Sequence, residues 1–211
     1  MKASSAKKNI LHKIKQALAK PVPLPFKTQH PSQQIFEKQP HDLEVAFAEN
    51  FTEVAGKFSF CINAEELSVQ LQTLLTSRNW KKIFIKDDKL QHSLQSAGLQ
   101  IEYTTDLANC DAAITGCEFL IARTGSIMLS TAQQSGRTVS VYTPIHICIA
   151  YTNQLVDDSK DALQIMQKKH QQKLPSLITF ATGPSRTADI EKTLVTGVHG
   201  PKEVFCFLIQ K

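Results

Sequence analysis

Closely spaced cysteines are absent from the sequence. The five cysteines, Cys61, Cys110, Cys117, Cys148 and Cys206, include no C-x-x-C pair. Iron–sulfur clusters and zinc ribbons need thiolates at such short spacings, so we expect no cluster in this chain. The count is odd, and three of the cysteines lie inside apolar strands (Cys61, Cys148, Cys206). This pattern indicates buried thiols in a reducing cytoplasm.

Long hydrophobic runs are also missing. The longest apolar stretches, such as residues 145–151, are interrupted by His146 and are too short to cross a bilayer. The first apolar cluster is broken by His12, Lys13 and Lys15, which argues against a secretory signal. We therefore expect a cytoplasmic protein with no membrane partner.

Acidic residues are absent from the first twenty positions, which contain six lysines. Subtracting these six from the 24 basic residues leaves 18 against 19 acidic ones, a net charge of −1 for the remainder. Because nucleic-acid binding needs a cationic patch on the folded surface, we expect no nucleic-acid partner. The lysines are expected to form a solvated helix face, with docking to an acidic partner as the alternative.

The N-terminal segment predicts a helical arm. Ile10, Leu11, Ile14 and Leu18 recur at helical spacing over residues 4–19. The following "KPVPLPF" places three prolines in five residues, which predicts an extended linker up to about residue 40. We therefore divide the chain into an arm, residues 1–40, and a domain, residues 41–211. The apolar stripe is expected to pack on the domain or on a second copy in a homo-oligomer.

Residues 41–104 alternate between helical and strand patterns. Helices are predicted over 41–56, 63–79 and 87–98, and strands over 57–62, 81–86 and 99–104. Such alternation predicts an α/β fold with a largely parallel sheet and helices on both faces.

The middle of the chain has a different pattern. Short β-branched runs at 127–130, 138–142 and 145–149 predict a meandering or mixed sheet inserted into the α/β frame. A helix over 158–170, a strand over 174–183, a helix from about 187 and a closing strand over 203–209 are then expected.

The stretch "ATGPSRTADIE", residues 181–191, allows two interpretations. Gly183 and Pro184 form a turn, and Ser185 could cap a helix that begins near Thr187. Alternatively, Arg186 and the free N–H groups of that helix bind an anion, since a cation at a helix N-terminus is otherwise unfavourable.

Two further turns are candidate binding elements. Thr124, Gly125 and Ser126 follow an apolar strand, where their backbone could approach a ligand or simply form a hairpin. Arg137, in "QQSGRT", could hold a carboxylate or phosphate through two hydrogen bonds.

Candidate proton carriers are His146, in the apolar "TPIHICI", and His199, in "TGVHGP". A core histidine and a simple turn are the alternatives. Neither has a second ligand at metal-binding spacing, so we expect no metal. Cys117 lies beside Glu118, which disfavours its thiolate, so Glu118 is the better candidate as a pocket acid.

Three blocks, "ITGCEFLIARTGSIMLS", "GRTVSVYTPIHICIAYTNQLV" and "ITFATGPSRTADIEKTLVTGVHGPKEVFCFLI", together resemble the LUD-domain family, in particular its lactate utilisation protein C group. They cover about half of the chain. The resemblance implies a Rossmann-like sheet of the sugar-phosphate isomerase and CoA-transferase (NagB/RpiA-like) type. It also implies iron–sulfur partner proteins in a bacterial system that oxidises L-lactate to pyruvate. It implies no settled catalytic mechanism, and no cofactor is assigned.

One position departs from the family pattern. Arg123 precedes Thr124-Gly125 where the family commonly has an acidic residue. With Arg137 and Arg186 it would form a cationic cluster for a carboxylate or a phosphate.

Three functions remain open at this point. The favoured one is a lactate-utilisation subunit that binds a small organic anion or an anionic cofactor. Its site would be lined by Thr124–Ser126, Arg137 and Gly183–Arg186, with His146 and His199 as proton carriers. The second is a free-standing isomerase, CoA-transferase or cyclo-ligase that uses Glu118 on a phosphorylated or CoA-linked substrate. The third is a non-catalytic assembly protein whose arm binds a partner.

Overall fold

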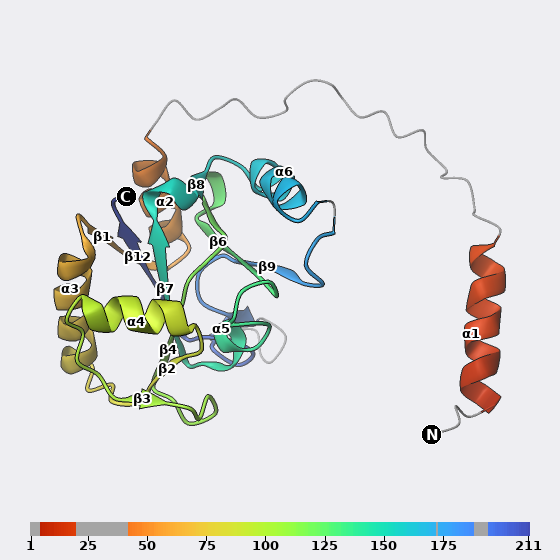
Figure 1. The fold of residues 1–211 in the computed structure, drawn as a ribbon, viewed down its shortest axis with the longest axis horizontal. Coiled ribbons are helices and arrows are strands. Elements are labelled where there is room, and N and C mark those ends of the chain that lie inside the picture. The colour runs from red at the N-terminus through yellow and green to blue at the C-terminus, as the bar shows by residue number, and fades with distance from the viewer. Residues whose placement is uncertain (1–4, 20–41, 172, 188–193) are drawn as a thin grey trace. The chain divides into compact units, whose positions relative to one another are not determined.

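A computed structural model describes residues 5–19, 42–171, 173–187 and 194–211 (Figure 1). The chain forms two compact units, residues 1–37 and residues 38–211. The predicted linker lies outside the described residues. Among the described helices, none combines the length and the apolar character needed to cross a bilayer.

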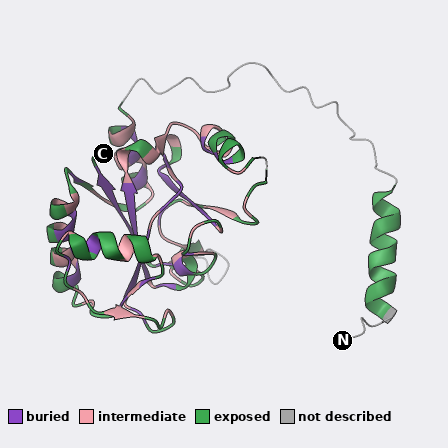
Figure 2. Cartoon of the chain, in the orientation of Figure 1, coloured by how far each residue is buried: buried purple, intermediate pink, exposed green. Residues whose placement is uncertain are grey.

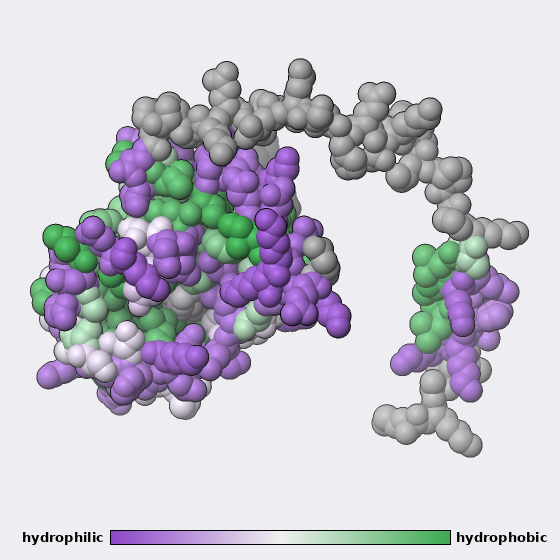
Figure 3. All heavy atoms as spheres, turned by 45° about the horizontal axis from the view of Figure 1, so that its top comes forward, coloured by the Kyte–Doolittle hydropathy of each residue, from purple (hydrophilic) through white to green (hydrophobic). Residues whose placement is uncertain are grey.

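The first unit contains helix α1, Ser5–Leu18, which confirms the helix predicted over residues 4–19. Its four large aliphatic side chains are 50–75% exposed. Figure 3 shows them gathered along one side of the helix, with hydrophilic residues on the other.

The second unit is built on a six-stranded sheet in the order β1-β12-β7-β4-β2-β3. All neighbouring strands in it are parallel. The strands are β1 (Lys57–Cys61), β2 (Ile83–Ile85), β3 (Tyr103–Thr104), β4 (Ala112–Thr115), β7 (Ile145–Tyr151) and β12 (Glu203–Ile209). The predicted α/β fold with a parallel sheet is therefore confirmed.

Helices α3 (Ala64–Ser77) and α4 (Asp88–Ser96) cover one face of this sheet. Asn63 starts α3 by accepting a hydrogen bond from the Glu66 N–H, and Asp87 starts α4 through Lys89 and Leu90. Their apolar stripes pack on aliphatic side chains of the strands. In Figure 2 the central strands are buried, whereas the helices are exposed on their outer sides.

Helix α2 (Leu43–Glu53) and a second, four-stranded sheet cover the opposite face, where Phe47 and Phe51 are fully buried. The second sheet has the order β8-β5-β6-β9. Its strands are β5 (Phe119–Ile121), β6 (Ser126–Ser130), β8 (Leu155–Val156) and β9 (Ile178–Ala181). Helix α6 (Ser159–Lys169) packs on Ile121 and Met128 of this sheet (Figure 1). The predicted mixed sheet in the middle of the chain is therefore present.

Two of the β-branched runs were assigned wrongly. Residues 138–142 form a helical turn, α5 (Val139–Tyr142), instead of a strand. The N–H groups of Val141 and Tyr142 donate to the Thr138 carbonyl, and Val139 is buried against Cys110 and Ala113. The run at 145–149 is a strand, but it lies at the centre of the parallel sheet and not in the inserted one. Short β-branched runs therefore do not identify the sheet to which they belong.

The prediction of a helix that begins near Thr187 is also wrong at that residue. Arg186–Thr187 is a short strand, β10, paired antiparallel with β11, Val195–Thr196. Residues 188–193 lie outside the described part of the chain. The turn residues Gly183 and Pro184 thus lead into a short strand, so Arg186 and Thr187 are not the start of a helix.

Candidate functional site

The Thr124–Ser126 turn approaches helix α2 closely. It follows a 3₁₀ turn, η1 (Ala122–Thr124), and Gly125 adopts φ +57° and ψ +40°. A Cβ at Gly125 would overlap the backbone of Asn50 and Phe51. The Asn50 side chain also donates to the Ala122 carbonyl at 2.8 Å. The glycine therefore permits close packing of the turn on a helix.

The same region joins two of the predicted site segments. The buried Ser126 hydroxyl contacts Thr124 Oγ1 at 2.7 Å and Thr182 Oγ1 at 2.8 Å. Gly183 follows with φ +76°, and a Cβ there would overlap the Val54 carbonyl. Residues 124–126 and 182–186 thus converge at the C-terminal end of α2.

Arg186 interacts with the end of that helix. Its guanidinium Nη2 donates to the carbonyl of Val54, the C-cap residue of α2, at 2.6 Å. A cation is favourable at this negative end of the helix dipole, and it satisfies a carbonyl that the helix leaves unpaired. The position of Arg186 is therefore explained by capping of α2, without a bound anion.

The other two arginines bind different segments. Arg123 lies 3.4 Å from Asp157 and 3.3 Å from Asp158, which also caps α6. Arg137 is exposed and donates to Ser176 Oγ at 2.7 Å. Each of the three guanidinium groups thus has its own partner. The proposed cationic cluster gains no support from these contacts.

Glu118 follows the carboxyl end of β4 and is buried. Its Oε1 accepts a hydrogen bond from Ser130 at 2.7 Å, and its Oε2 lies 2.8 Å from Lys169 Nζ. A buried carboxylate needs such partners. Ser130 and Lys169 were not identified from the sequence, because they lie 12 and 51 residues away from Glu118.

His146 is a fully buried core residue on β7. Its Nε2 lies 2.8 Å from Thr115 Oγ1, whereas Nδ1 has no hydrogen-bond partner among the described residues. Burial lowers the pKa of His146 to about 4, so the ring is neutral at pH 7.

Three buried thiols lie on the same side of the sheet. All five cysteines are free, and Cys117, Cys148 and Cys206 belong to the core beneath α2. Hydrogen bonding with Cys148 and burial raise the pKa of the Cys117 thiol, with a smaller contribution from Glu118. The prediction that the Cys117 thiolate is disfavoured is confirmed. Among the described residues, no group of three or more His, Cys, Asp and Glu side chains suits a metal ion.

His199 lines an open cavity of about 530 Å³. Lys202, Tyr142 and Thr143 lie on its wall, together with Ala108, Cys110, Val141, Pro144, Gly197, Val198 and Gly200. Backbone hydrogen bonds connect its segments: Ser185 N–H donates to the Pro201 carbonyl and Lys202 N–H to the Pro144 carbonyl. The cavity therefore combines an ammonium, an imidazole and hydroxyl groups. Lys202 and Tyr142 lack any sequence signal, because only the fold brings α5 beside residues 197–202.

The three predicted catalytic residues occupy three different places. Glu118 lies beyond the carboxyl end of β4, and His146 is enclosed within the sheet core. His199 precedes β12 and therefore lies at the amino edge of the parallel sheet. Glu118 and His199 thus lie at opposite edges and do not share one site.

Comparison with known proteins gives a family and a fold. The model of the LUD domain matches residues 44–209. A "Lactate utilization protein C" of Anoxybacillus flavithermus is 30% identical over 152 residues, covering 66% of this chain and 68% of that protein. Its namesake in Bacillus subtilis is 34% identical over 101 residues, covering 47% and 42%. An uncharacterised protein of Neisseria meningitidis serogroup B is 34% identical over 106 residues, covering 50% and 45%.

Most of these matches span about half the length of the curated relative. Among solved structures, a DUF162 family protein from Deinococcus radiodurans aligns with a TM-score of 0.60. The alignment covers 79% of this chain and 96% of that one, at 19% identity. At this identity the likeness shows the fold alone.

Proposed function

The chain belongs to the LUD-domain family, and from this premise we propose that it takes part in bacterial lactate utilisation as a cytoplasmic component. The observation that supports this proposal is the recurrence of the name "Lactate utilization protein C" among relatives that are 30–37% identical. The finer assignment of the fold to the sugar-phosphate isomerase and CoA-transferase type remains a prediction.

We place the binding of a small organic anion in the cavity lined by His199 and Lys202. A carboxylate there would pair with the Lys202 ammonium, and the neighbouring hydroxyl or oxo group would face His199. Oxidation of lactate to pyruvate removes two electrons and two protons. His199 would accept the hydroxyl proton, and the C2 hydrogen would leave with both electrons to the redox centres of the iron–sulfur partner proteins.

Binding of lactate and pyruvate to the full chain, measured by calorimetry, tests this site. We expect Lys202→Met to weaken both affinities about tenfold or more, because methionine keeps the aliphatic stem but removes the charge. Lys160→Met, at an exposed position on α6, serves as the matched control and should change neither affinity.

Unchanged affinities in Lys202→Met would exclude this cavity as the anion site. The alternative, a free-standing enzyme of the isomerase, CoA-transferase or cyclo-ligase type, is supported by the buried Glu118 with its Ser130 and Lys169 partners. Turnover of a phosphorylated or CoA-linked substrate by the isolated chain, lost in Glu118→Gln, would favour that alternative.

A further inference from the structure

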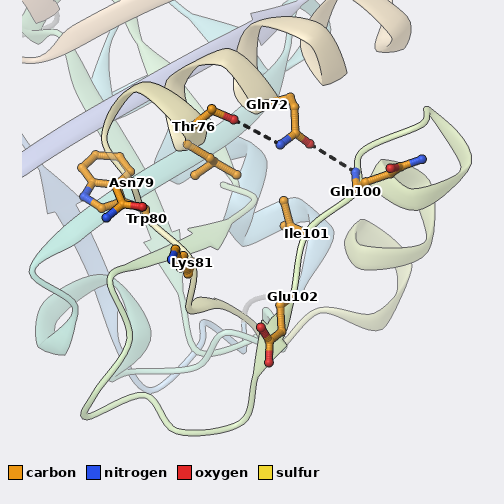
Figure 4. A pocket seen from close by; sticks show the side chains of 9 residues that line it. Gln72, Thr76, Asn79, Trp80, Lys81, Gln100, Ile101 and Glu102 are labelled. Carbon is orange, nitrogen blue, oxygen red and sulfur yellow. Dashed lines mark hydrogen bonds between the residues drawn. The ribbon is translucent and has the colours of Figure 1, made fainter.

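A second cavity, of about 310 Å³, lies at a different part of the amino edge of the sheet (Figure 4). It is formed by the C-terminal half of α3, the turn that precedes β2, and residues 100–102, which precede β3. Its volume is at the lower end of the range for small-molecule sites. None of the residues considered so far lines it.

The apolar part of this cavity is rigid. Leu75 is 2% exposed, and Ile101 packs on the same core. Trp80 is half-buried, and its ring packs edge-to-face on Phe205 with centroids 5.9 Å apart. The Arg78 guanidinium also lies over the indole, 5.6 Å from its centroid. Because these contacts fix the ring before any ligand arrives, a planar ligand that stacks on the indole in place of Arg78 would meet a ring that is already ordered.

One polar side chain braces the cavity. Figure 4 shows Gln72 between Thr76 and Gln100. Its Oε1 accepts from the Gln100 N–H at 3.3 Å, and its Nε2 donates to Thr76 Oγ1 at 3.5 Å. Helix α3 and the loop before β3 are thereby held together.

Three other polar side chains are available to a ligand. Within the described part of the chain, the Asn79 amide makes no side-chain hydrogen bond, and Lys81 and Glu102 form no ion pair. Figure 4 shows the Gln100 side chain directed away from Trp80. The backbones of Lys81 and Glu102 are nevertheless fixed. The Lys81 N–H donates to Asp111 at 2.7 Å, and the Glu102 carbonyl accepts from Ile83.

We propose that this cavity binds a nucleoside monophosphate. The base would stack on Trp80 and present its edge to the neighbouring amide of Asn79. The Glu102 carboxylate would accept hydrogen bonds from the ribose hydroxyls, and the Lys81 ammonium would bind the phosphate. A simple carboxylate would leave the indole and the Asn79 amide unused, and Glu102 would repel it. This inference is independent of the site proposed for lactate.

Titration of the full chain with AMP tests the proposal directly. Trp80 is the only tryptophan in the sequence, so a change in tryptophan fluorescence reports on this cavity alone. We expect saturable binding of AMP and about tenfold weaker binding of adenosine, which lacks the phosphate. Ribose 5-phosphate, which lacks the base, should leave the fluorescence unchanged.

Two substitutions test the contact with the phosphate and the contact with the ribose separately. Lys81→Met should lower the AMP affinity about tenfold, to the level of adenosine, without changing adenosine binding. Glu102→Gln should weaken the binding of both AMP and adenosine. Lys89→Met, at an exposed lysine on α4 outside the cavity, is the matched control. The proposal is overturned if neither fluorescence nor calorimetry detects AMP binding, or if Lys81→Met and Glu102→Gln bind AMP as the unsubstituted chain does.

Discussion

The two faces of strand β7 have different chemistry. One face carries three isoleucines, and the other carries a histidine, a cysteine and an alanine. Ile147 and His146 are neighbours in sequence and both fully buried, but Ile147 packs under α3 and α4. The opposite face lies beneath α2 and the second sheet.

This difference follows from what covers each face. Amphipathic helices present a broad aliphatic stripe, which is best matched by large branched side chains. The opposite face holds smaller side chains and a polar ring, whose hydrogen bond must come from a neighbouring strand, here from Thr115. The face beneath α3 and α4 is therefore packed with aliphatic side chains, whereas the face beneath α2 carries the ionisable ring of His146.

The largest expected effect tests the aliphatic face. Ile147→Ala should lower the free energy of unfolding by about 2–5 kcal/mol, because it leaves a cavity among closely packed side chains. Cys148→Ala, at the next position and on the other face, removes only the sulfur atom and should cost about 1 kcal/mol. Urea unfolding measures both values. Equal losses would show that the two faces are packed alike.

The next effect concerns His146 and pH. Its pKa is about 4 in the folded chain, against 6.5 for an unperturbed histidine. The unfolded chain therefore takes up the proton first as the pH falls, so folding stability decreases between about pH 6.5 and 4. The lowered pKa of His146 predicts that the free energy of unfolding is about 2 kcal/mol smaller at pH 5 than at pH 7.

Unfolding of the unsubstituted chain and of His146→Gln should be compared over this pH range. The substituted chain should lose less stability on acidification, because one buried proton-binding group has been removed. Parallel pH profiles would mean that other groups dominate.

The smallest effect concerns α2, which covers the second face. Arg186→Ala should lower the free energy of unfolding by about 0.3–1 kcal/mol, because the last carbonyl of α2 loses its cation. It should leave lactate and pyruvate affinities unchanged. A loss of anion binding without a loss of stability would instead restore the interpretation of Arg186 as an anion ligand.

Much of the fold could be predicted from the sequence. The cap residue Asn63 marked the start of α3, and Gly98 marked the end of the helix predicted over residues 87–98, which is α4. The apolar run at 203–209 identified β12. These signals are local, since a cap and its helix lie within a few residues of each other. The turn at 139–142 was missed because its conformation depends on packing against Cys110 and Ala113.

The candidate site was less predictable, and Arg186 shows why. The sequence placed it beside a glycine–proline turn, which gave no indication that residue 54 would be its partner. Likewise, Glu118 depends on Lys169, and the His199 cavity depends on Tyr142 and Lys202. Each of these contacts joins segments that are distant in the chain.

The sequence by itself determined the alternation of helices and strands, the parallel sheet and the amphipathic arm, because periodicity and capping act between near neighbours. Only the tertiary structure decided which charges meet. In that structure Arg186 donates a hydrogen bond to the C-cap carbonyl of α2, Arg123 pairs with two aspartates, and His199 lines an open cavity. Ion pairs and cavities form where strand order and layer packing bring remote segments together, and no local pattern specifies that order.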